Sequence, residues 1–260
     1  MAGNPQTESM LRRIAWIGGA MLTLMVITAA ISRKKAMPVA ATVVKVKPLE
    51  GGTLLIDSAD VIKIINRSLG DALDDQLAGD VDADRVERVL EEDPFVKNAE
   101  VALTANSRVI IEVEQREPIL RVRDKQGSQY YLDNTGTRVP LSNHFAARTL
   151  VATGNIQPHT PEFLKKKKNE MKDLFELTQF ILDDDLWRAL IEQIYVNNHK
   201  EFVLVPKVGD QAILLGKFEN IEDKFRRLRV FYEKAASYEG WQKYRTIDLR
   251  YRGQVVCGRR

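Results

Sequence analysis

The residues that could carry out chemistry in this 260-residue chain are few and widely spaced. The sequence holds three histidines, His144, His159 and His199, and one cysteine, Cys257. No two of these histidines are four residues apart, the spacing that would place both on one helix face around a metal ion. A single cysteine cannot form an internal disulfide. The sequence therefore predicts no metal site and no bound cofactor.

Two further stretches resemble functional motifs only in part. Gly209 and Gly216 are separated by six residues, whereas a phosphate-binding loop has four, and Phe218 stands where a hydroxyl residue would hold Mg²⁺. The acidic run at residues 91–93 is expected to be a solvated helix end and not an acid–base pair. The chain also lacks a G-x-S-x-G nucleophile elbow. These observations argue against an enzyme.

Composition indicates an ordinary globular chain. Hydrophobic residues make up 44% of the sequence and charged residues 29%, and the formal net charge is +3. The length allows one or two domains. Because the bulk charge is small, nucleic-acid binding is not indicated.

One segment near the N-terminus is apolar enough to cross a bilayer. Residues 14–31 carry no charge, and at 1.5 Å per residue they span about 27 Å as a helix. Basic residues flank both sides, at positions 12–13 and 33–35. The length of the apolar run favours a retained anchor over a cleaved signal peptide. The flanking charges do not decide its orientation.

Residues 82–118 contain the clearest local pattern. We expect a short helix with a capping box formed by Asp84 and Glu87, ended by Pro94. Residues 98–103 and 109–114 then alternate apolar and polar side chains, which predicts a β-hairpin with one buried face.

The segment before this hairpin completes an α+β module. Residues 42–47 have strand character, and Asp57 or Ser58 is expected to cap a helix that stops near Gly70. The order for residues 42–118 is thus strand, helix, helix, strand, strand, with two helices packed on one face of a small sheet.

Residues 119–260 read as a mixed β-domain with packed helices. Short strands are expected over residues 119–123, 129–132, 193–196, 202–206 and 211–216. A helix is expected to open at Pro161, with the lysine run 165–168 in its solvated first turn, and another at Asn220. The last strand is expected over residues 244–251.

That last strand is the best candidate for a binding site. Ile247, Leu249 and Tyr251 alternate with Asp248 and Arg250. If the strand lies at a sheet edge, its unpaired backbone groups can accept a strand from a partner. A strand fully paired within its own sheet explains the pattern equally well.

The order of these motifs behind a single apolar segment resembles the bacterial cell-division FtsQ/DivIB family, in its Bacteroidetes-like form. The residues that carry the resemblance are Asp84-x-Val86 through Leu90, Pro94-Phe95-Val96-Lys97-x-Ala99-x-Val101, Ile111-x-Val113-x-x-Arg116-Glu117-Pro118, Tyr131-Leu132-Asp133-x-x-Gly136 and Ile247-Asp248-Leu249-Arg250-Tyr251. The resemblance implies a cytoplasmic tail (1–13), a transmembrane helix (14–31), a linker (32–41), a POTRA module (42–118) and an FtsQ-type β-domain (119–260).

The resemblance also implies a function. Proteins of this family are non-enzymatic scaffolds of the divisome in the inner membrane, with the bulk of the chain periplasmic at the division septum. They bind the FtsB–FtsL pair and so act indirectly on FtsW and FtsI, the enzymes of septal peptidoglycan synthesis. By position, the implied partner-binding residues are Ile247, Asp248, Leu249, Arg250, Tyr251, Gly253 and Val255. An aromatic residue that some members carry beyond this strand is replaced by the sequence Cys-Gly-Arg-Arg at residues 257–260.

Two other functions stay open from the sequence. One is a different POTRA-containing transport or assembly factor anchored in a membrane, although such proteins usually carry repeated POTRA modules or a barrel. The other is a membrane-anchored cell-wall enzyme. The lipid bilayer is an expected partner in each case, and nucleic acid in none.

Overall fold

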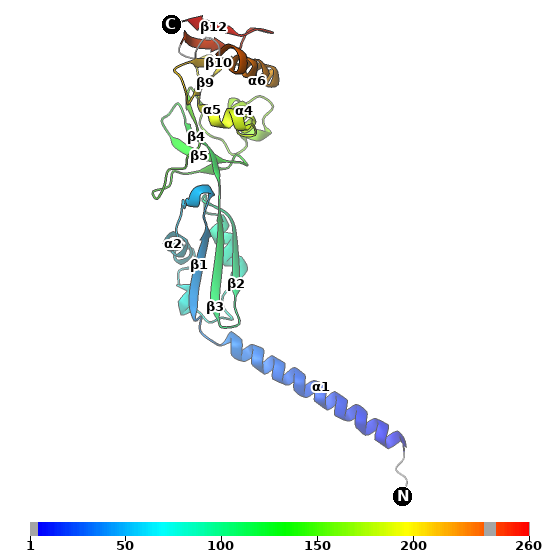
Figure 1. The fold of residues 1–260 in the computed structure, drawn as a ribbon. Helices are drawn as coiled ribbons and strands as arrows, with labels where there is room; N and C mark the ends of the chain where they lie inside the picture. Colours follow the sequence, from blue (N-terminus) through cyan, green and yellow to red (C-terminus); the bar gives the residue numbers. More distant parts are fainter. Residues whose placement is uncertain (1–4, 237–242, 260) are drawn as a thin grey trace. The chain divides into compact units, whose positions relative to one another are not determined.

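The computed structural model describes residues 5–236 and 243–259 (Figure 1). The chain divides into two compact units, of which the first comprises Met1–Pro48 and Ile56–Gln115, and the second Leu49–Leu55 and Arg116–Arg260. Each unit has its own hydrophobic core.

The N-terminal helix α1 runs over Pro5–Lys35. Within it, Trp16–Lys35 forms a 20-residue segment with a mean hydropathy of 1.5 and no buried part. The hydroxyls of Thr23 and Thr28 donate to carbonyls three or four residues back. This satisfies both hydroxyls inside the helix, as a bilayer requires. By length and composition α1 can cross a membrane. Residues 1–4 of the expected tail lie outside the described residues, as do the side chains of residues 5–15.

The first unit contains the expected strand–helix–helix–strand–strand order. Its elements are β1 (Ala41–Lys47), α2 (Ser58–Leu69), η2 (Leu73–Asp75), α3 (Ala83–Glu91), β2 (Val96–Leu103) and β3 (Arg108–Gln115). The described strands form a sheet in the order β1-β3-β2, with β1 parallel and β2 antiparallel to the central β3. Its core joins one face of the sheet to the apolar sides of both helices. The α+β prediction for this unit is confirmed.

Helix α2 begins and ends where its sequence predicts. The Asp57 side chain accepts a hydrogen bond from the Asp60 backbone N–H, and the Asp60 side chain accepts one from the Asp57 backbone. This reciprocal capping box satisfies two donors at the helix start. Gly70 ends the helix at φ +86°, a left-handed conformation that glycine adopts without a steric cost.

Helix α3 begins two residues earlier than predicted. Its cap is Asp82, which accepts from the Arg85 N–H at 3.0 Å, so Asp84 lies inside the helix and the predicted cap is wrong. Asp82 is extended (φ −86°, ψ 91°), as an N-cap residue must be. Glu87, expected in the capping box, instead accepts from the backbone N–H of Val101 in β2 at 2.7 Å.

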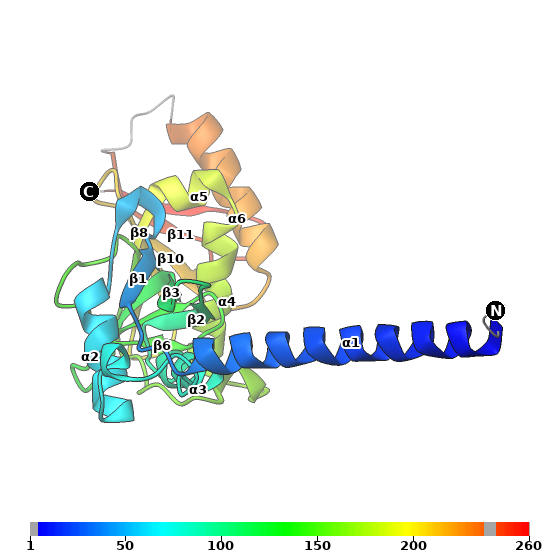
Figure 2. The ribbon, with the colours of Figure 1, turned by 90° about the horizontal axis from the view of Figure 1, so that it is seen from below.

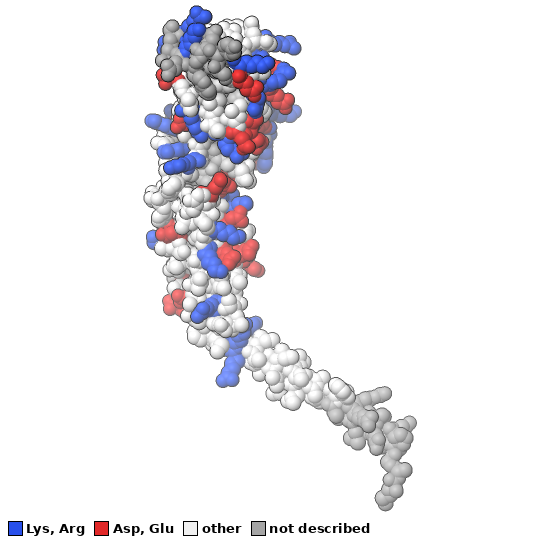
Figure 3. Space-filling model, in the orientation of Figure 1, with Lys and Arg blue, Asp and Glu red and all other residues white. Residues whose placement is uncertain are grey.

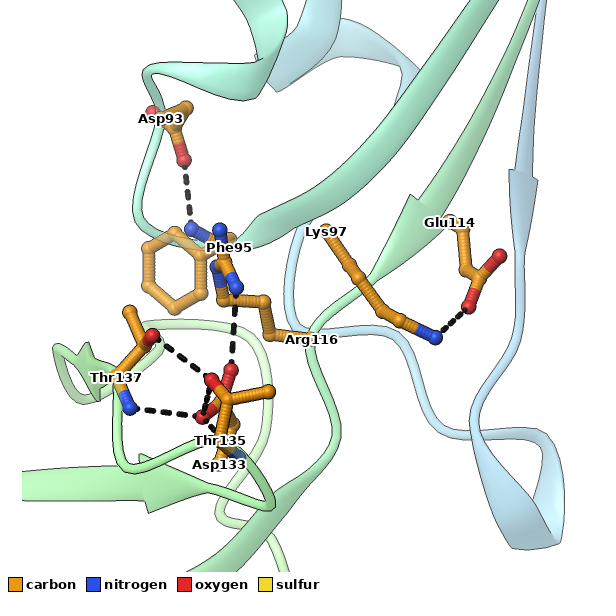
Figure 4. Close-up of polar contacts among 8 residues, drawn as sticks. All are labelled: Asp93, Phe95, Lys97, Glu114, Arg116, Asp133, Thr135 and Thr137. Carbon is orange, nitrogen blue, oxygen red and sulfur yellow. Dashed lines mark hydrogen bonds and ion pairs between the residues drawn. The ribbon is translucent and has the colours of Figure 1, made fainter.

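The two faces of the first sheet differ as its alternation predicts. Val109, Ile111 and Val113 of β3 are fully buried, and burying each stabilises the fold by about 1.5–3 kcal/mol. On the opposite face, exposed ion pairs join Lys97 to Glu114 at 2.6 Å (Figure 4) and Lys45 to Glu112 at 3.0 Å. Exposed pairs of this kind contribute little to stability.

The described strands of the second unit form one mixed sheet of nine. They are β4 (Pro118–Arg123), β5 (Gln129–Asp133), β6 (Arg138–Val139), β7 (Leu150–Gly154), β8 (Ile191–Val196), β9 (Phe202–Pro206), β10 (Ala212–Gly216), β11 (Tyr244–Asp248) and β12 (Val256–Arg259). Their spatial order is β12-β11-β10-β9-β8-β7-β4-β5-β6. The remaining elements are η1 (Glu50–Gly52), η3 (Phe163–Lys165), α4 (Glu170–Leu182), α5 (Asp185–Leu190), α6 (Ile221–Val230) and the π-helical turn η4 (Phe231–Ala236). Helices α4, α5 and α6 lie along one side of this sheet (Figures 1 and 2).

An aromatic cluster joins these helices within the second core. The ring of Phe225 on α6 lies 5.1 Å from that of Trp187 on α5 and 4.8 Å from that of Phe180 on α4, centroid to centroid. The Trp187 contact is edge-to-face and the Phe180 contact is tilted, and aromatic pairs of this kind stabilise the fold beyond the apolar area that they bury. The cluster fixes α6 against the sheet, and α6 in turn supports the C-terminal strands.

A buried aspartate explains the Asp133-x-x-Gly136 motif. One oxygen of Asp133 accepts from the backbone N–H groups of Thr135 and Thr137 and from the Thr135 hydroxyl, at 2.6–2.9 Å (Figure 4). Its other oxygen lies 3.1 Å from the guanidinium of Arg116. Gly136 closes the turn at φ +82°. The motif forms a hydrogen-bonded turn that is tied to Arg116.

One expected helix start is wrong, and another helix starts as expected but without the expected side-chain cap. The helix expected from Pro161 begins only at Glu170, where the Asn169 side chain caps it by accepting from the Met171 N–H at 2.8 Å. The lysine run 165–168 thus precedes α4, which avoids like positive charges at the positive end of the helix dipole. Asn220 does precede α6, but in a left-handed conformation and without a side-chain cap. Asp223 pairs with Arg226 and Arg227 and completes no capping box.

Candidate interaction site at the C-terminal sheet edge

The strand that holds the candidate binding residues does not lie at the edge of its sheet. β11 ends at Asp248, and the chain then turns and returns as β12, a strand not among those expected from the sequence. Ile247 faces Ile213 of β10 in parallel register on one side and Cys257 of β12 in antiparallel register on the other. Of the two alternatives left open, the fully paired strand is the one observed. Among the described strands, β12 and the two-residue β6 form the two ends of the sheet.

Asp248 explains why β11 stops so early. Its Oδ1 accepts the backbone N–H of Arg250 at 3.0 Å, and its Oδ2 accepts the Arg250 guanidinium at 2.6 Å. A side chain that folds back onto the backbone in this way competes with the strand ladder. Burial raises the pKa of Asp248, but the hydrogen bonds and charge of Arg250 outweigh it and hold that pKa below its usual value. Gly253, at φ +73°, then allows the chain to reverse.

Arg227 of α6 holds this turn in place. Its guanidinium donates to the carbonyls of Leu249 at 3.2 Å, Tyr251 at 3.0 Å and Gln254. The Asp223 carboxylate orients it through a 2.8 Å contact from Nε. The Arg227 side chain is only 13% exposed. Since charge-assisted hydrogen bonds are among the stronger ones, Arg227 fixes the path of the chain between β11 and β12.

The structure separates the seven predicted binding residues by exposure. Ile247, Asp248 and Leu249 are buried, so their side chains cannot meet a partner. Arg250 and Gly253 are exposed, Val255 is half-buried, and Tyr251 is 51% exposed. Only these last four can contribute side-chain or turn contacts at the surface.

Sequence reasoning missed the residues that form the real edge. Val256 begins β12 and is 41% exposed. The apolar run at residues 255–257, after the reversal at Gly253, is the signal that could have predicted a further strand. Arg227 could not have been found, because its role depends on the packing of α6 against the turn.

The chemistry of this edge is backbone hydrogen bonding beside basic and apolar side chains. Residues 224–260 contain 11 Lys and Arg against 3 Asp and Glu, although the rest of the chain is slightly acidic. Several Lys and Arg side chains of the second unit are visible in Figure 3. An open strand edge among cations and apolar groups can bind an extended peptide.

These features define a class: a chain with an N-terminal apolar helix, a POTRA-like module and a mixed β-domain that ends in an edge strand. A family model described as a POTRA-like domain matches residues 50–114. A second, described as FtsQ/DivIB, C-terminal related, matches residues 117–258, more than half of the chain.

The chain belongs to the FtsQ/DivIB family. It is also similar to a protein named cell division protein FtsQ from Rhodothermus marinus, with 30% identity over 179 residues. The match covers 67% of this chain and 63% of the length of that relative.

Proposed function

We propose that this protein is a non-enzymatic scaffold of the cell-division machinery that binds the FtsB–FtsL pair through its β-domain. The observation that carries the proposal is the outer side of β12, to which no described strand is paired. A strand from the partner would extend the sheet by main-chain hydrogen bonds, and the neighbouring side chains would set specificity. The family membership and the relative's name support a role in division.

The predicted binding residues are still part of this proposal, but they lie around the turn before β12 and not along one edge strand. Tyr251, Gly253 and Val255 border the start of β12, and Arg250 lies at the same turn. Ile247, Asp248 and Leu249 support that turn from inside. The partner strand would therefore pair with β12 and not with β11.

The proposal includes a location in the cell. α1 would anchor the chain in the cytoplasmic membrane as a single span, with its N-terminus cytoplasmic and the bulk of the chain periplasmic at the septum. The apolar segment Trp16–Lys35 supports the span. Binding of FtsB–FtsL there would help couple divisome assembly to peptidoglycan synthesis by FtsW and FtsI.

The test is binding of the full chain in lipid nanodiscs to the FtsB–FtsL pair of the same organism, with Tyr251→Glu as the variant. We expect saturable binding that the variant weakens by about 2–5 kcal/mol, since it places a charge in a partly desolvated contact. Tyr195→Glu is the matched control, because Tyr195 on β8 is 42% exposed and three strands lie between β8 and β12.

The outcomes separate the role from the site. Binding that is lost with Tyr251→Glu and kept with Tyr195→Glu supports both. If both variants bind as tightly as the wild type, the scaffold role is kept and the edge at β12 is rejected as the binding site. If the wild-type chain does not bind the pair, the scaffold proposal itself is rejected.

A further inference from the structure

Two segments of the first unit pair with each other where α1 ends. Three backbone hydrogen bonds of 2.8–3.0 Å join residues 35–39 to residues 76–79, and Pro38 faces Leu77 in an isolated antiparallel bridge. One of these bonds is accepted by the carbonyl of Lys35, the last residue of α1. Carbonyls at the end of a helix have no partner within it, and here the loop supplies one. The paired segments thus connect α1 directly to the rest of the first unit.

Gly79 shows how closely the two segments approach each other. A Cβ atom added at this position would lie 2.7 Å from the Cβ of Lys35 and 2.9 Å from its carbonyl oxygen. Backbone atoms cannot move aside as the end of a flexible side chain can, so any larger residue would push the segments apart. Glycine is the residue that permits such a close approach of two backbones.

The turn between β2 and β3 adds a third contact at the same place. The N–H of Ala40 donates to the carbonyl of Ser107 at 2.8 Å, and the Ser107 hydroxyl lies 4.0 Å from the sulfur of Met37. Strand β1 begins at the next residue, Ala41, and pairs with β3 from its first position. Nearly every residue between α1 and β1 is therefore held by a neighbouring segment.

Apolar side chains are nevertheless exposed around the paired segments. Met37 is 51% exposed and Leu77 is 43% exposed, and Pro38 is exposed as well. Single exposed apolar residues are common in soluble proteins and need no explanation. These three differ because they are gathered at the end of a helix that is long and apolar enough to cross a membrane.

The length of α1 places this group at a bilayer surface. The segment Trp16–Lys35 has 20 residues, which span about 30 Å as a helix and match a hydrocarbon core of about 30 Å. The headgroup layers add about 5–8 Å on each side. Met37 follows Lys35 by two residues, about 7 Å at full extension. Met37 and the paired Leu77 are therefore within reach of the headgroup layer once α1 spans the bilayer.

We infer that the paired segments seat the first unit on a lipid surface. The side chains of Met37, Pro38 and Leu77 lie in the headgroup layer, next to the acyl chains, where their apolar area leaves water. The pairing with residues 76–79 provides a second membrane contact beside the helix itself. The inference goes beyond the proposed function and rests only on its membrane span, not on binding of the FtsB–FtsL pair.

The contact is apolar and not electrostatic. Residues 33–35 contribute three positive charges, and residues 74–80 contribute three aspartates. These charged residues are all exposed. Because the two sets balance, the local charge does not favour anionic over zwitterionic lipid. A bilayer of phosphatidylcholine alone should therefore support the contact.

The experiment uses the full chain in phosphatidylcholine nanodiscs, with a fluorescent label on a single cysteine. Cys257→Ser removes the natural cysteine, and Leu77→Cys places the label at the paired segments. We expect nitroxides on the lipid headgroups to quench this label at least about threefold more strongly than a label at Ile62→Cys.

Ile62 is the matched control for Leu77. It is 40% exposed and lies on α2 in the same unit. The N–H of Ile56, just before α2, donates to Gln115 at the last residue of β3, whereas the paired segments adjoin the other end of β3, at Ser107. A label at Ile62 should therefore stay in water.

A label at Met25→Cys, within the apolar segment, measures the membrane span by itself. Nitroxides deep in the acyl chains should quench it. If they do not, α1 is not inserted, and both the anchor of the proposed function and the lipid contact are rejected. If Met25 is quenched while Leu77 is quenched no more than Ile62, the anchor stands and the lipid contact is overturned.

Gly79→Val, added to the chain labelled at Leu77, tests whether the pairing seats the unit. The valine side chain would collide with Lys35 and separate the segments. Quenching should fall to the level of the Ile62 control, and the amides of residues 76–79 should exchange at least about tenfold faster. Continued protection of β3 amides checks the fold, and the smaller Gly79→Ala replaces the variant if that protection is lost. Unchanged quenching after the amides are released would overturn the role of the pairing.

Discussion

The two sheets of this protein differ at one edge strand each: carboxylates bind backbone N–H groups of β2, whereas no described strand pairs with the outer side of β12. In the first unit, α3 lies along β2, and Glu87 accepts the N–H of Val101 at 2.7 Å while Glu91 accepts that of Ala99 at 3.4 Å. Two outward donors of that edge are thereby occupied by carboxylates. In the second unit, Arg227 of α6 binds the turn before β12, and no described strand pairs with the outer side of β12.

The difference shows that a nearby helix can either occupy the backbone groups of an edge strand or position the strand without occupying them. Unpaired edges invite pairing with other chains, and proteins commonly block them with charged side chains. The carboxylates of α3 do this for β2. Arg227 of α6 instead donates its hydrogen bonds to carbonyls of the turn, which positions the start of β12 without occupying the backbone groups of that strand.

The largest effect is expected from loss of the Arg227 contacts. Arg227→Met keeps the length and apolar stem of the side chain but removes its hydrogen bonds to three carbonyls and to Asp223. We expect a destabilisation of about 2–4 kcal/mol and faster amide hydrogen exchange in β12, measured by denaturant unfolding and mass spectrometry.

Arg226→Met is the control for that variant. Arg226 contacts the same Asp223 carboxylate, but its side chain is 75% exposed, so its removal should change stability by less than about 0.5 kcal/mol. Equal effects of the two variants would show that Arg227 acts only as one more surface charge. The idea of a helix that presents β12 would then be wrong.

A smaller effect is expected at the closed edge. Glu87→Ala leaves the Val101 N–H without its acceptor, which should cost about 1 kcal/mol and speed hydrogen exchange at that amide. Combined with Glu91→Ala, it should open the edge and produce self-association that increases with concentration, seen by light scattering.

Glu87→Gln tests whether acceptance of the hydrogen bond is what matters. Glutamine keeps a side-chain oxygen at the same distance along the chain, so Val101 should stay protected in this variant. Protection that persists in the alanine variant would mean that α3 shields β2 by packing alone, and the contrast with β12 would lose its basis.

The sequence predicted the architecture better than the site. Periodicity and turn residues are local signals, and they predicted β1, α2, β2, β3 and most strands of the second unit. The predicted cap of α3 was two residues away from the observed one. Asp82 and Asp84 are both plausible caps, and only the backbone conformation distinguishes them. β12 has only four residues and shows no periodicity, so the apolar run at residues 255–257 was the one signal for it, and no separate strand was expected for that run.

The open edge could not have been predicted from the sequence. Whether β11 or β12 is terminal depends on strand order, which is a property of long-range pairing. The roles of Arg227 and Glu87 also depend on where their helices pack, since both are ordinary charged positions in the sequence. The alternation of residues 247–251 and the family resemblance both point to Tyr251, and its role in binding stays a prediction.

The smallest expected effect is a difference between the two units in how their stability depends on pH. All three histidines belong to the second unit, and His159 lies between the rings of Tyr130 and Phe163, at 5.8 and 5.5 Å. Its Nε2 is buried without a hydrogen-bond partner among the described atoms. Burial lowers the pKa of His159 below its usual value of 6.5, although a backbone hydrogen bond to Gly136 partly opposes the shift.

The sign of the pH effect follows from linkage. As the pH falls below about 6.5, the unfolded chain takes up a proton at His159 more readily than the folded chain does, so the free energy of unfolding decreases until the folded pKa is passed. Above pH 6.5 this contribution is complete. We expect His159→Phe, which keeps a ring in the core, to flatten the stability of the second unit between pH 7 and 5, followed by unit-specific hydrogen exchange. His199→Gln, at an exposed turn, should leave the slope unchanged. If the first unit loses stability over the same range, the slope does not come from His159, and the pH contrast between the two units is wrong.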